Sequence, residues 1–279
     1  MSRLELIVDN GLTLRQFIPE DAGVIFELID TNRGHLSQNG DDTAKKYKTE
    51  KEVLDSILHP KNQARQRFGI WSIDAYVGTI NVTPEDDKAE MGYYLGAQHQ
   101  GHGYMGRAVH RIVNYCFDDL RLQKIWAKVH VNNEKSTSVL FASGFRVNED
   151  KPSDDCIYFS LQRLDEEPLK KLIDAPIDQD GLMDSFYKMI KILNRSSKHP
   201  QYHRLLEHVY NRITRVFDTD DGGATLFYRA DYMLALLGRA ITKVKIPEES
   251  FAVIKKKFYD MKARNNCQKI LPYEEIFQK

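Results

Sequence analysis

The chain has 279 residues, which is long enough for two domains of ordinary size and too short for three. Lysine and arginine together number 40, as do aspartate and glutamate, and 42% of the residues are hydrophobic. This balance is typical of a folded globular protein and does not indicate a nucleic-acid or membrane partner.

The three cysteines, Cys116, Cys156 and Cys267, are scattered and lack the paired spacing of a zinc site or a disulfide framework. Such usage favours a reducing compartment. The N-terminal residues mix acids with apolar residues, and the chain contains no apolar run of membrane-spanning length. The sequence therefore predicts a cytoplasmic protein without a metal site.

Strand and helix signals alternate in the first part of the chain, which is the pattern of a mixed α/β layer structure. The predicted strands are Leu12–Ile18, Arg67–Ile73, Tyr76–Val82, Ala89–Leu95, Lys124–Val131 and Cys156–Gln162. The predicted helices are one opened by Pro19 that carries Val24, Ile25, Leu28 and Ile29, then Thr49–Leu58, one that follows Gly103, and Glu134–Ser143.

The second part of the chain shows helical signals only. Its predicted helices are Pro168–Ile173, Gly181–Leu193, Gln201–Phe217, Ala224–Val244 and Glu248–Lys262. An acidic, proline-containing stretch precedes most of them. We therefore expect a mixed α/β domain over residues 1–164, a linker over 165–180 and an all-helical domain of unknown role over 181–279.

The most informative segment joins a strand end to a helix start through Gly101, Gly103 and Gly106. A helix start has unpaired N–H groups and the positive end of the helix dipole, so a glycine approach can seat a phosphate. The segment lacks the Gly-Lys-Ser/Thr of a P-loop and does not follow the first strand of a βαβ unit. Glycines that only shape a tight turn are the alternative.

Two neighbouring runs resemble the acetyl-CoA signature of the GNAT acetyltransferases. They are Glu90-Met91-Gly92-Tyr93-Tyr94-Leu95 and Gln100-Gly101-His102-Gly103-Tyr104-Met105. The signature has Gln or Arg, two residues, Gly, one residue, and then Gly or Ala. Gln100 and Gly103 match it, whereas Met105 departs from it in the way that RimL-like members do. A second register, Gln98, Gly101 and Gly103, also satisfies the pattern.

Further landmarks follow the RimJ/RimL branch in the same order. Residues 31–36 are similar to its Asn-Arg-x-His-Leu element, although the tryptophan often found shortly after is absent. Asn133 and Ser136 match the Asn-x-x-Ser that opens a helix, and that helix ends in Gly144-Phe145. The resemblance covers Leu12 to about Leu164.

This resemblance implies an α/β (α+β) GNAT acyltransferase fold with a central mixed, mainly antiparallel sheet, followed here by an all-α C-terminal domain. It implies an acetyl-CoA-dependent N-acetyltransferase whose pantetheine arm pairs with one strand and whose pyrophosphate sits on the glycine loop. The cofactor-binding residues that it implies are Tyr93, Tyr94, Leu95, Gln100, Gly101, His102, Gly103, Tyr104, Met105, Gly106 and Asn133.

Acetyl transfer needs a base for the amine and an acid for the leaving thiolate. By resemblance the base is Glu90, with a pKa that a desolvated cleft would raise; the alternative is a solvent-facing strand acid. The acid is Ser136. The alternative is that its side chain only satisfies backbone donors at the start of its own helix. Asn133 either fixes the cofactor or caps the same helix.

Three functions stay open from the sequence. The first is acetylation of a primary amine at a protein N-terminus, as RimJ/RimL enzymes do on ribosomal proteins. The second is the same chemistry on a small amine or antibiotic. The third is acetyl-CoA or partner binding without turnover, with the helical half as the working part. RimJ/RimL relatives are often dimers, so the resemblance also implies a homodimer.

Overall fold

The computed structural model describes residues 3–38, 42–73, 75–148, 155–174 and 182–209, together with Ala252, Lys255, Lys256 and Tyr259. Contacts between Cα atoms divide the chain into two units, Met1–Arg163 and Leu164–Lys279. Within the described ranges, no helix combines the length and the apolar character that a membrane crossing requires.

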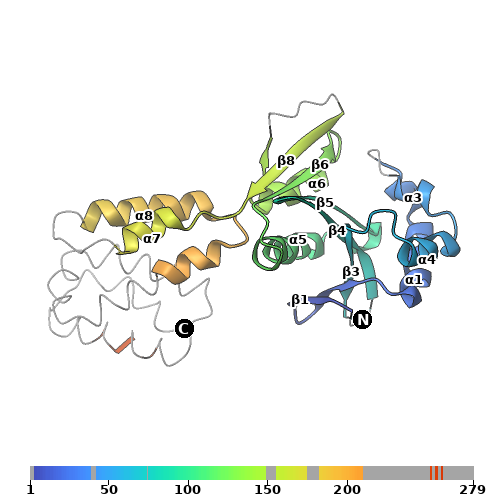
Figure 1. Ribbon diagram of the computed structural model, residues 1–279, viewed down its shortest axis with the longest axis horizontal. Helices are drawn as coiled ribbons and strands as arrows, with labels where there is room; N and C mark the ends of the chain where they lie inside the picture. The colour runs from blue at the N-terminus through green and yellow to red at the C-terminus, as the bar shows by residue number, and fades with distance from the viewer. Residues whose placement is uncertain are drawn as a thin grey trace. The chain divides into compact units, whose positions relative to one another are not determined.

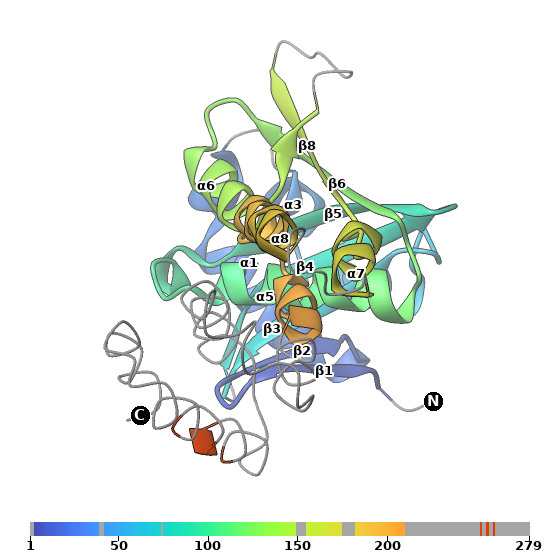
Figure 2. The ribbon, with the colours of Figure 1, turned by 90° about the vertical axis from the view of Figure 1, so that its left-hand side faces the viewer.

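The described part of the first unit is built on an eight-stranded sheet of order β1-β2-β3-β4-β5-β6-β8-β7. Figure 2 shows the strands in this order, from β1 at the bottom to β8 at the top. The strands are β1 (Glu5–Asp9), β2 (Leu12–Gln16), β3 (Gln66–Ser72), β4 (Ala75–Glu85), β5 (Lys88–Leu95), β6 (Lys124–His130), β7 (Arg146–Val147) and β8 (Cys156–Gln162). Neighbours are antiparallel except β5 and β6, which are parallel. The predicted mixed, mainly antiparallel sheet is therefore confirmed.

The six predicted strands all form, with shifts of a few residues at their ends. Leu12 and Leu14 of β2 are buried as the alternation predicts, but the strand ends at Gln16, before Ile18. The strands β1 and β7 were not predicted.

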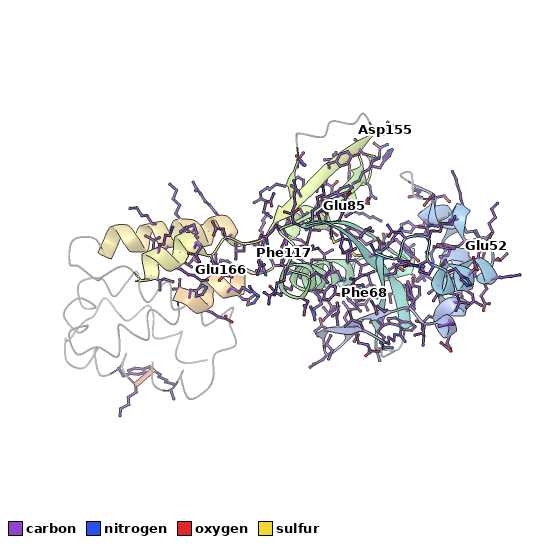
Figure 3. All side chains as sticks on the ribbon, viewed as in Figure 1. Glu52, Phe68, Glu85, Phe117, Asp155 and Glu166 are labelled. Carbon is purple, nitrogen blue, oxygen red and sulfur yellow. The ribbon has the colours of Figure 1, made fainter. Side chains whose placement is uncertain are left out.

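One face of the sheet packs on α5 (Tyr104–Asn114) and α6 (Glu134–Ala142). Figure 3 labels Phe68 of β3 and Phe117, which follows α5, within this unit. Both phenylalanines are fully buried. The helix α5 has the apolar spacing predicted for the segment after Gly103.

A second apolar cluster joins the helices near the N-terminus to Trp71 and Tyr76 of the sheet. Figure 1 shows α1, α3 and α4 grouped together at the side of the sheet away from α5. These helices and their neighbours are η1 (Pro19–Asp21), α1 (Ala22–Thr31), α2 (Arg33–Leu36), α3 (Thr43–Lys46) and α4 (Glu50–Leu58). Of the four residues predicted on the apolar face of α1, Val24 is the exception, because its side chain is 41% exposed.

Local chemistry explains where α4 and α5 begin and how α5 ends. Thr49 caps α4 in a reciprocal box with Glu52, so the helix begins one residue later than predicted. Gly103 precedes α5 in the left-handed conformation. Beyond α5 the helix continues as a π-helix, η4 (Tyr115–Asp119), a widening that apolar periodicity does not reveal.

The described part of the second unit is helical. It contains α7 (Glu167–Asp174), α8 (Leu182–Ser196) and a helical stretch over residues 202–209. Its buried apolar residues are Leu169, Ile173, Met189, Leu193, Leu205, Leu206 and Val209. The helices expected over Ala224–Val244 and Glu248–Lys262 lie outside the described ranges except at four single positions.

Candidate active site

The parallel contact between β5 and β6 is short. Only three residue pairs align along it, Lys88 with Lys124, Ala89 with Ile125 and Glu90 with Trp126. Beyond these pairs, both strands continue, β5 to Leu95 and β6 to His130, while keeping their other neighbours, β4 and β8. The facing backbone edges of β5 and β6 therefore lie unpaired along this stretch, which we call the seam.

A glycine turn follows β5 and leads into α5. Gly101 and Gly103 have φ values of +81° and +69°, in the left-handed region that L side chains rarely adopt. Arg107 donates its N–H to the carbonyl of Gly103, so the N–H groups just before it are the free donors of the helix start. A Cβ atom added at Gly101, Gly103 or Gly106 would meet no heavy atom within 4 Å. Open space beside free N–H donors fits a diphosphate group.

The segment before this turn is held by the Asn-Arg-x-His-Leu element. The Ala97 N–H donates to Oδ1 of Asn32 at 2.7 Å, and the Asn32 amide donates to the Leu28 carbonyl at 2.9 Å. His35 lies 2.8 Å from Nε2 of Gln100. Because Asn32 is buried, the hydrogen bonds of its side chain fix the end of α1 against the approach to the glycine turn.

The start of α6 lies beside β5. Oδ1 of Asn133 accepts a hydrogen bond from the Ser136 N–H at 3.1 Å, so Asn133 caps this helix. The hydroxyl oxygens of Ser136 and Tyr93 are 2.8 Å apart. Burial raises the pKa of Tyr93 to about 12, so its hydroxyl is protonated at neutral pH.

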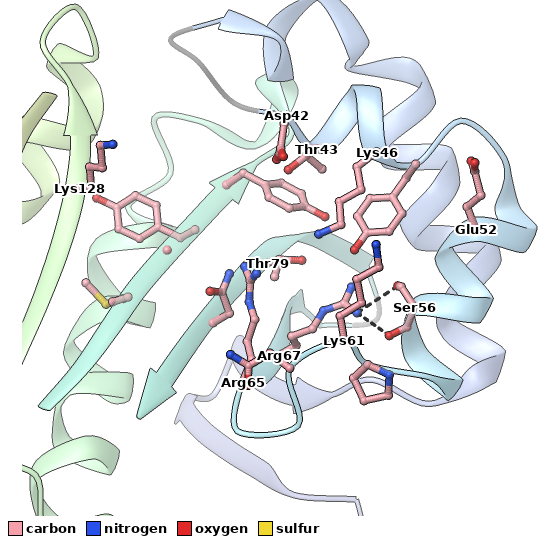
Figure 4. Close-up of a pocket in the computed structure, with 18 of the residues that line it drawn as sticks. Asp42, Thr43, Lys46, Glu52, Ser56, Lys61, Arg65, Arg67, Thr79 and Lys128 are labelled. Atoms are coloured by element: carbon pink, nitrogen blue, oxygen red, sulfur yellow. Dashed lines mark hydrogen bonds between the residues drawn. The ribbon is translucent and has the colours of Figure 1, made fainter. Parts of the chain in front are cut away.

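A cavity of about 870 Å³ extends from the seam to the helices of the second apolar cluster. On the seam side it is lined by residues from both β5 and β6, by Asn133 and by Ser136. On the opposite side it is lined by residues of α3, α4 and the loop between α4 and β3. Figure 4 draws side chains from both sides around this space.

Three linked hydroxyl groups lie beside the cavity. Oη of Tyr76 is 2.7 Å from Oγ1 of Thr79 and 3.1 Å from Oη of Tyr94. Burial raises the pKa of Tyr76 well above 10.0 and also raises the pKa of Tyr94. Thr79 and Tyr94 line the cavity, so neutral hydroxyl groups form part of its wall.

The structure brings some of the predicted site residues together and separates others. Tyr93, Tyr94, Asn133 and Ser136 line one cavity. The residues of the glycine turn do not line it. Glu90 lies in the paired part of β5, with an exposed side chain outside the cavity lining. The sequence predicts a desolvated cleft that raises the pKa of Glu90, but the structure does not place Glu90 in such a cleft.

The last predicted loop residues belong to the helix. Tyr104, Met105 and Gly106 form the first turn of α5, and the Met105 side chain is 6% exposed within the apolar core. Tyr104 accepts a hydrogen bond from Ser72 at 3.0 Å. His102 is exposed and stacks on Tyr104 with ring centroids 5.4 Å apart. Because its side chain is buried, Met105 can offer only its backbone groups to a ligand at this turn.

Sequence reasoning assigned no role to the basic residues that line the cavity. They come from α3, α4, β3, β6 and the loop between α4 and β3, and no motif links them. The one signal that could have found most of them is the local excess of Lys and Arg over residues 45–67, which the neutral overall charge conceals.

Comparisons with known proteins agree with this geometry. The model of the acetyltransferase (GNAT) domain matches residues 11–146. The uncharacterized N-acetyltransferase p20 of Bacillus licheniformis is 36% identical over 154 residues, which cover 51% of this chain and 83% of that protein. The ribosomal-protein-serine acetyltransferase of Escherichia coli is 26% identical, over 50% of this chain and 80% of that protein.

A solved structure gives the same fold. RimL, a ribosomal L7/L12 α-N-protein acetyltransferase in complex with coenzyme A, has a TM-score of 0.51 at 17% identity. The match covers 57% of this chain and 98% of that one. Together with the 36% identity to the Bacillus licheniformis protein, these findings show that the chain belongs to the GNAT family of acetyltransferases.

Proposed function

We propose that this N-acetyltransferase transfers the acetyl group of acetyl-CoA to the α-amino group at the N-terminus of a protein. The observation that carries the proposal is that one cavity joins the seam and Ser136 to a broad opposite wall. A group held at the seam and an amine that enters from the opposite side would meet beside Ser136. The relatives that act on ribosomal proteins support the choice of acceptor.

The residues present fit acetyl-CoA at two places. The unpaired edge of β5 near Tyr93 and Leu95 offers backbone groups to an extended amide chain, as an added strand would use them. The space beside Gly101, Gly103 and Gly106 is open, so the backbone N–H groups of this turn suit a diphosphate. When bound, acetyl-CoA supplies an activated acetyl thioester.

The roles that we propose for Tyr93 and Ser136 follow from their positions, and the role of Glu90 follows from the family resemblance. Tyr93 can donate a hydrogen bond to Oγ of Ser136, which leaves the Ser136 proton free to pass to the leaving sulfur, and water then returns a proton to Ser136. Glu90 is the proposed base. Because its side chain is exposed, the amine proton would reach it through water. Neither step requires a covalent enzyme intermediate.

The cofactor site can be tested by thermal unfolding with and without acetyl-CoA. A ligand at 100 times its Kd stabilises the folded state by about 2.7 kcal/mol. Gly106→Glu places a carboxylate beside the proposed diphosphate seat in open space, so the variant should fold but lose this stabilisation. Gly34→Glu, also in open space, is the matched control and should keep it. If the unaltered chain gains no stability, the proposed cofactor site is wrong.

The acceptor can be tested with short peptides that carry a free or a blocked α-amino group. We expect coenzyme A release only with the free α-amine, and mass spectrometry should locate the acetyl group there. Release with small amines but with no peptide would favour the small-amine alternative. Binding of acetyl-CoA without release in either case would favour a module that binds without turnover.

A further inference from the structure

Five basic side chains line the cavity on the side away from the seam, Lys51 of α4 among them, and we call the other four the basic wall. These four are Lys46 at the end of α3, Lys61 and Arg65 between α4 and β3, and Arg67 on β3. Figure 4 shows all four around one space. The basic wall therefore concentrates positive charge in a chain whose formal net charge is zero.

Three carboxylates also line the cavity, those of Asp42, Glu52 and Asp55, and they do not pair with the basic wall. Glu52 accepts the backbone N–H groups of Lys48 and Thr49 at 2.6 and 2.9 Å, and Asp55 lies 3.1 Å from Nδ1 of His59. Among the described residues, no carboxylate forms an ion pair with any member of the basic wall.

Arg67 is the most firmly held member of the basic wall. Its Nη1 donates to the carbonyl and to Oγ of Ser56, both at 3.1 Å. Its guanidinium also lies over the Phe17 ring, 5.1 Å from the ring centroid. An arginine held by neutral groups keeps its full charge, so Arg67 presents a fixed cation beside the more exposed Lys61 and Arg65.

Six Lys and Arg side chains and three carboxylates line the cavity, so its formal charge is positive. A positive potential attracts an anionic substrate and repels a cationic one. The basic wall therefore disfavours a polyamine. It favours an acceptor that carries anions close to its amine. The same potential disfavours the ammonium form of a bound amine and so lowers its pKa, which helps acetyl transfer because the nucleophile must be neutral.

We infer that the preferred acceptor is a protein N-terminus with acidic side chains at its second to fourth residues, an inference that rests on the proposed function. An extended peptide advances about 3.3 Å per residue, so these side chains lie within about 10 Å of the amine. The amine would lie beside Ser136, and the carboxylates would contact the basic wall. A phosphorylated small amine carries similar negative charge and is the competing candidate for the acceptor.

Kinetics with matched peptides test this inference. All begin with serine and differ only in carrying glutamate, glutamine or lysine at positions two to four. Three exposed ion pairs of about 0.5 kcal/mol each predict a kcat/KM about tenfold higher for the glutamate peptide than for the glutamine peptide. The lysine peptide should be the poorest, and added salt should reduce the differences.

Each outcome separates the inference from the proposed function. Equal rates for the three peptides would overturn the acidic preference and leave peptide acetylation standing. Acetylation of none of them would overturn the proposed function itself. Faster acetylation of a phosphorylated small amine than of every peptide would overturn the peptide acceptor while keeping an anionic one.

Charge-reversal variants of the protein test whether the basic wall produces the preference for acidic peptides. Lys61→Glu and Arg65→Glu alter exposed side chains for which no hydrogen bond or ion pair is described, so the fold should persist. Each should lower kcat/KM for the glutamate peptide several-fold, raise it for the lysine peptide and leave the KM for acetyl-CoA unchanged. Lys171→Glu makes the same charge change on the exposed surface of α7 and should change none of these values. An unchanged peptide preference in Arg65→Glu would overturn the inference.

Discussion

The hydroxyl oxygens of Tyr93 and Ser136 lie 2.8 Å apart, although the two residues are separated by 43 positions in the chain. The pair joins β5, on one side of the seam, to the first turn of α6. It places a polarised serine hydroxyl at the cavity wall where the proposed thioester and amine would meet.

We expect Ser136→Ala to lower kcat by about 10²-fold, the lower end for a general acid, while the KM for acetyl-CoA changes little. Tyr93→Phe should lower kcat about tenfold, because it removes only the group that orients the serine. Steady-state release of coenzyme A measures both. Ser138→Ala, at an exposed position of the same helix, is the control. A rise in KM without a fall in kcat would assign Ser136 to binding instead.

The hydrogen bonds of Asn32 predict a linked loss of stability and cofactor affinity. Asn32→Ala leaves the Ala97 N–H without its partner, which costs about 1 to 3 kcal/mol in the free energy of unfolding, whereas the Leu28 carbonyl still accepts from the Thr31 hydroxyl. The KM for acetyl-CoA should rise because the approach to the glycine turn is no longer fixed. Denaturant unfolding and initial rates are the measurements. His35→Ala, which loses only its contact with Gln100, should have the smaller effect on both.

Two cysteines should differ sharply in their reaction with iodoacetamide. Cys116 is buried, and burial raises its pKa to about 12, so its thiolate is scarce and inaccessible. Cys156 is partly exposed and lines the cavity. Mass spectrometry of digested protein should find Cys156 modified and Cys116 unmodified in the folded chain. Acetyl-CoA should slow the modification of Cys156, and an unchanged rate would contradict occupancy of this cavity.

The pH dependence of the second unit should contain a contribution from Glu166. Burial alone would raise its pKa above 4.5, but hydrogen bonds from His208 and Lys170 outweigh burial and lower it. A carboxyl group whose pKa is lowered by folding stabilises the folded state above its unfolded pKa. This stabilisation is lost as the pH falls through the folded value.

We therefore expect Glu166→Gln to destabilise the second unit by about 1.5 kcal/mol at neutral pH, the lower end for hydrogen bonds to a charged group. The difference from the unaltered chain should shrink in acid. Hydrogen exchange along α7 measures this unit separately. Glu167→Gln, on the same helix with a side chain 67% exposed, should have little effect at any pH. A difference that does not depend on pH would exclude the charge of Glu166 as its cause.

Local patterns predicted most of the first unit because most of its elements have a strong apolar period. They missed β1, in which Leu6 is buried but Ile7 is 72% exposed, so the alternation is too short to stand out. They also missed β7, whose two residues, Arg146 and Val147, are both exposed. Each is a strand because its neighbour provides backbone partners, and a local window does not contain that neighbour.

The site was predictable where its residues are close in sequence. The glycine turn and the cap of α6 each lie within a few residues and appear as motifs. The cavity itself depends on how β3, β4 and β5 align, which brings Arg67 and Thr79 near Tyr94. The contact of Asn32 with Ala97 spans 65 positions. Strand register and helix packing set such distances, and the spacing of residues along the chain does not encode them.

The seam gives the sheet two edges in its interior. The backbone ladder joins the five strands from β1 to β5 to the remaining three along three residue pairs. Strand edges with free donors and acceptors invite an extended chain to pair with them. If acetyl-CoA fills this gap as we propose, the metabolite serves as a missing strand as well as a reactant. The lifetime of the folded protein would then follow the supply of acetyl-CoA in the cell.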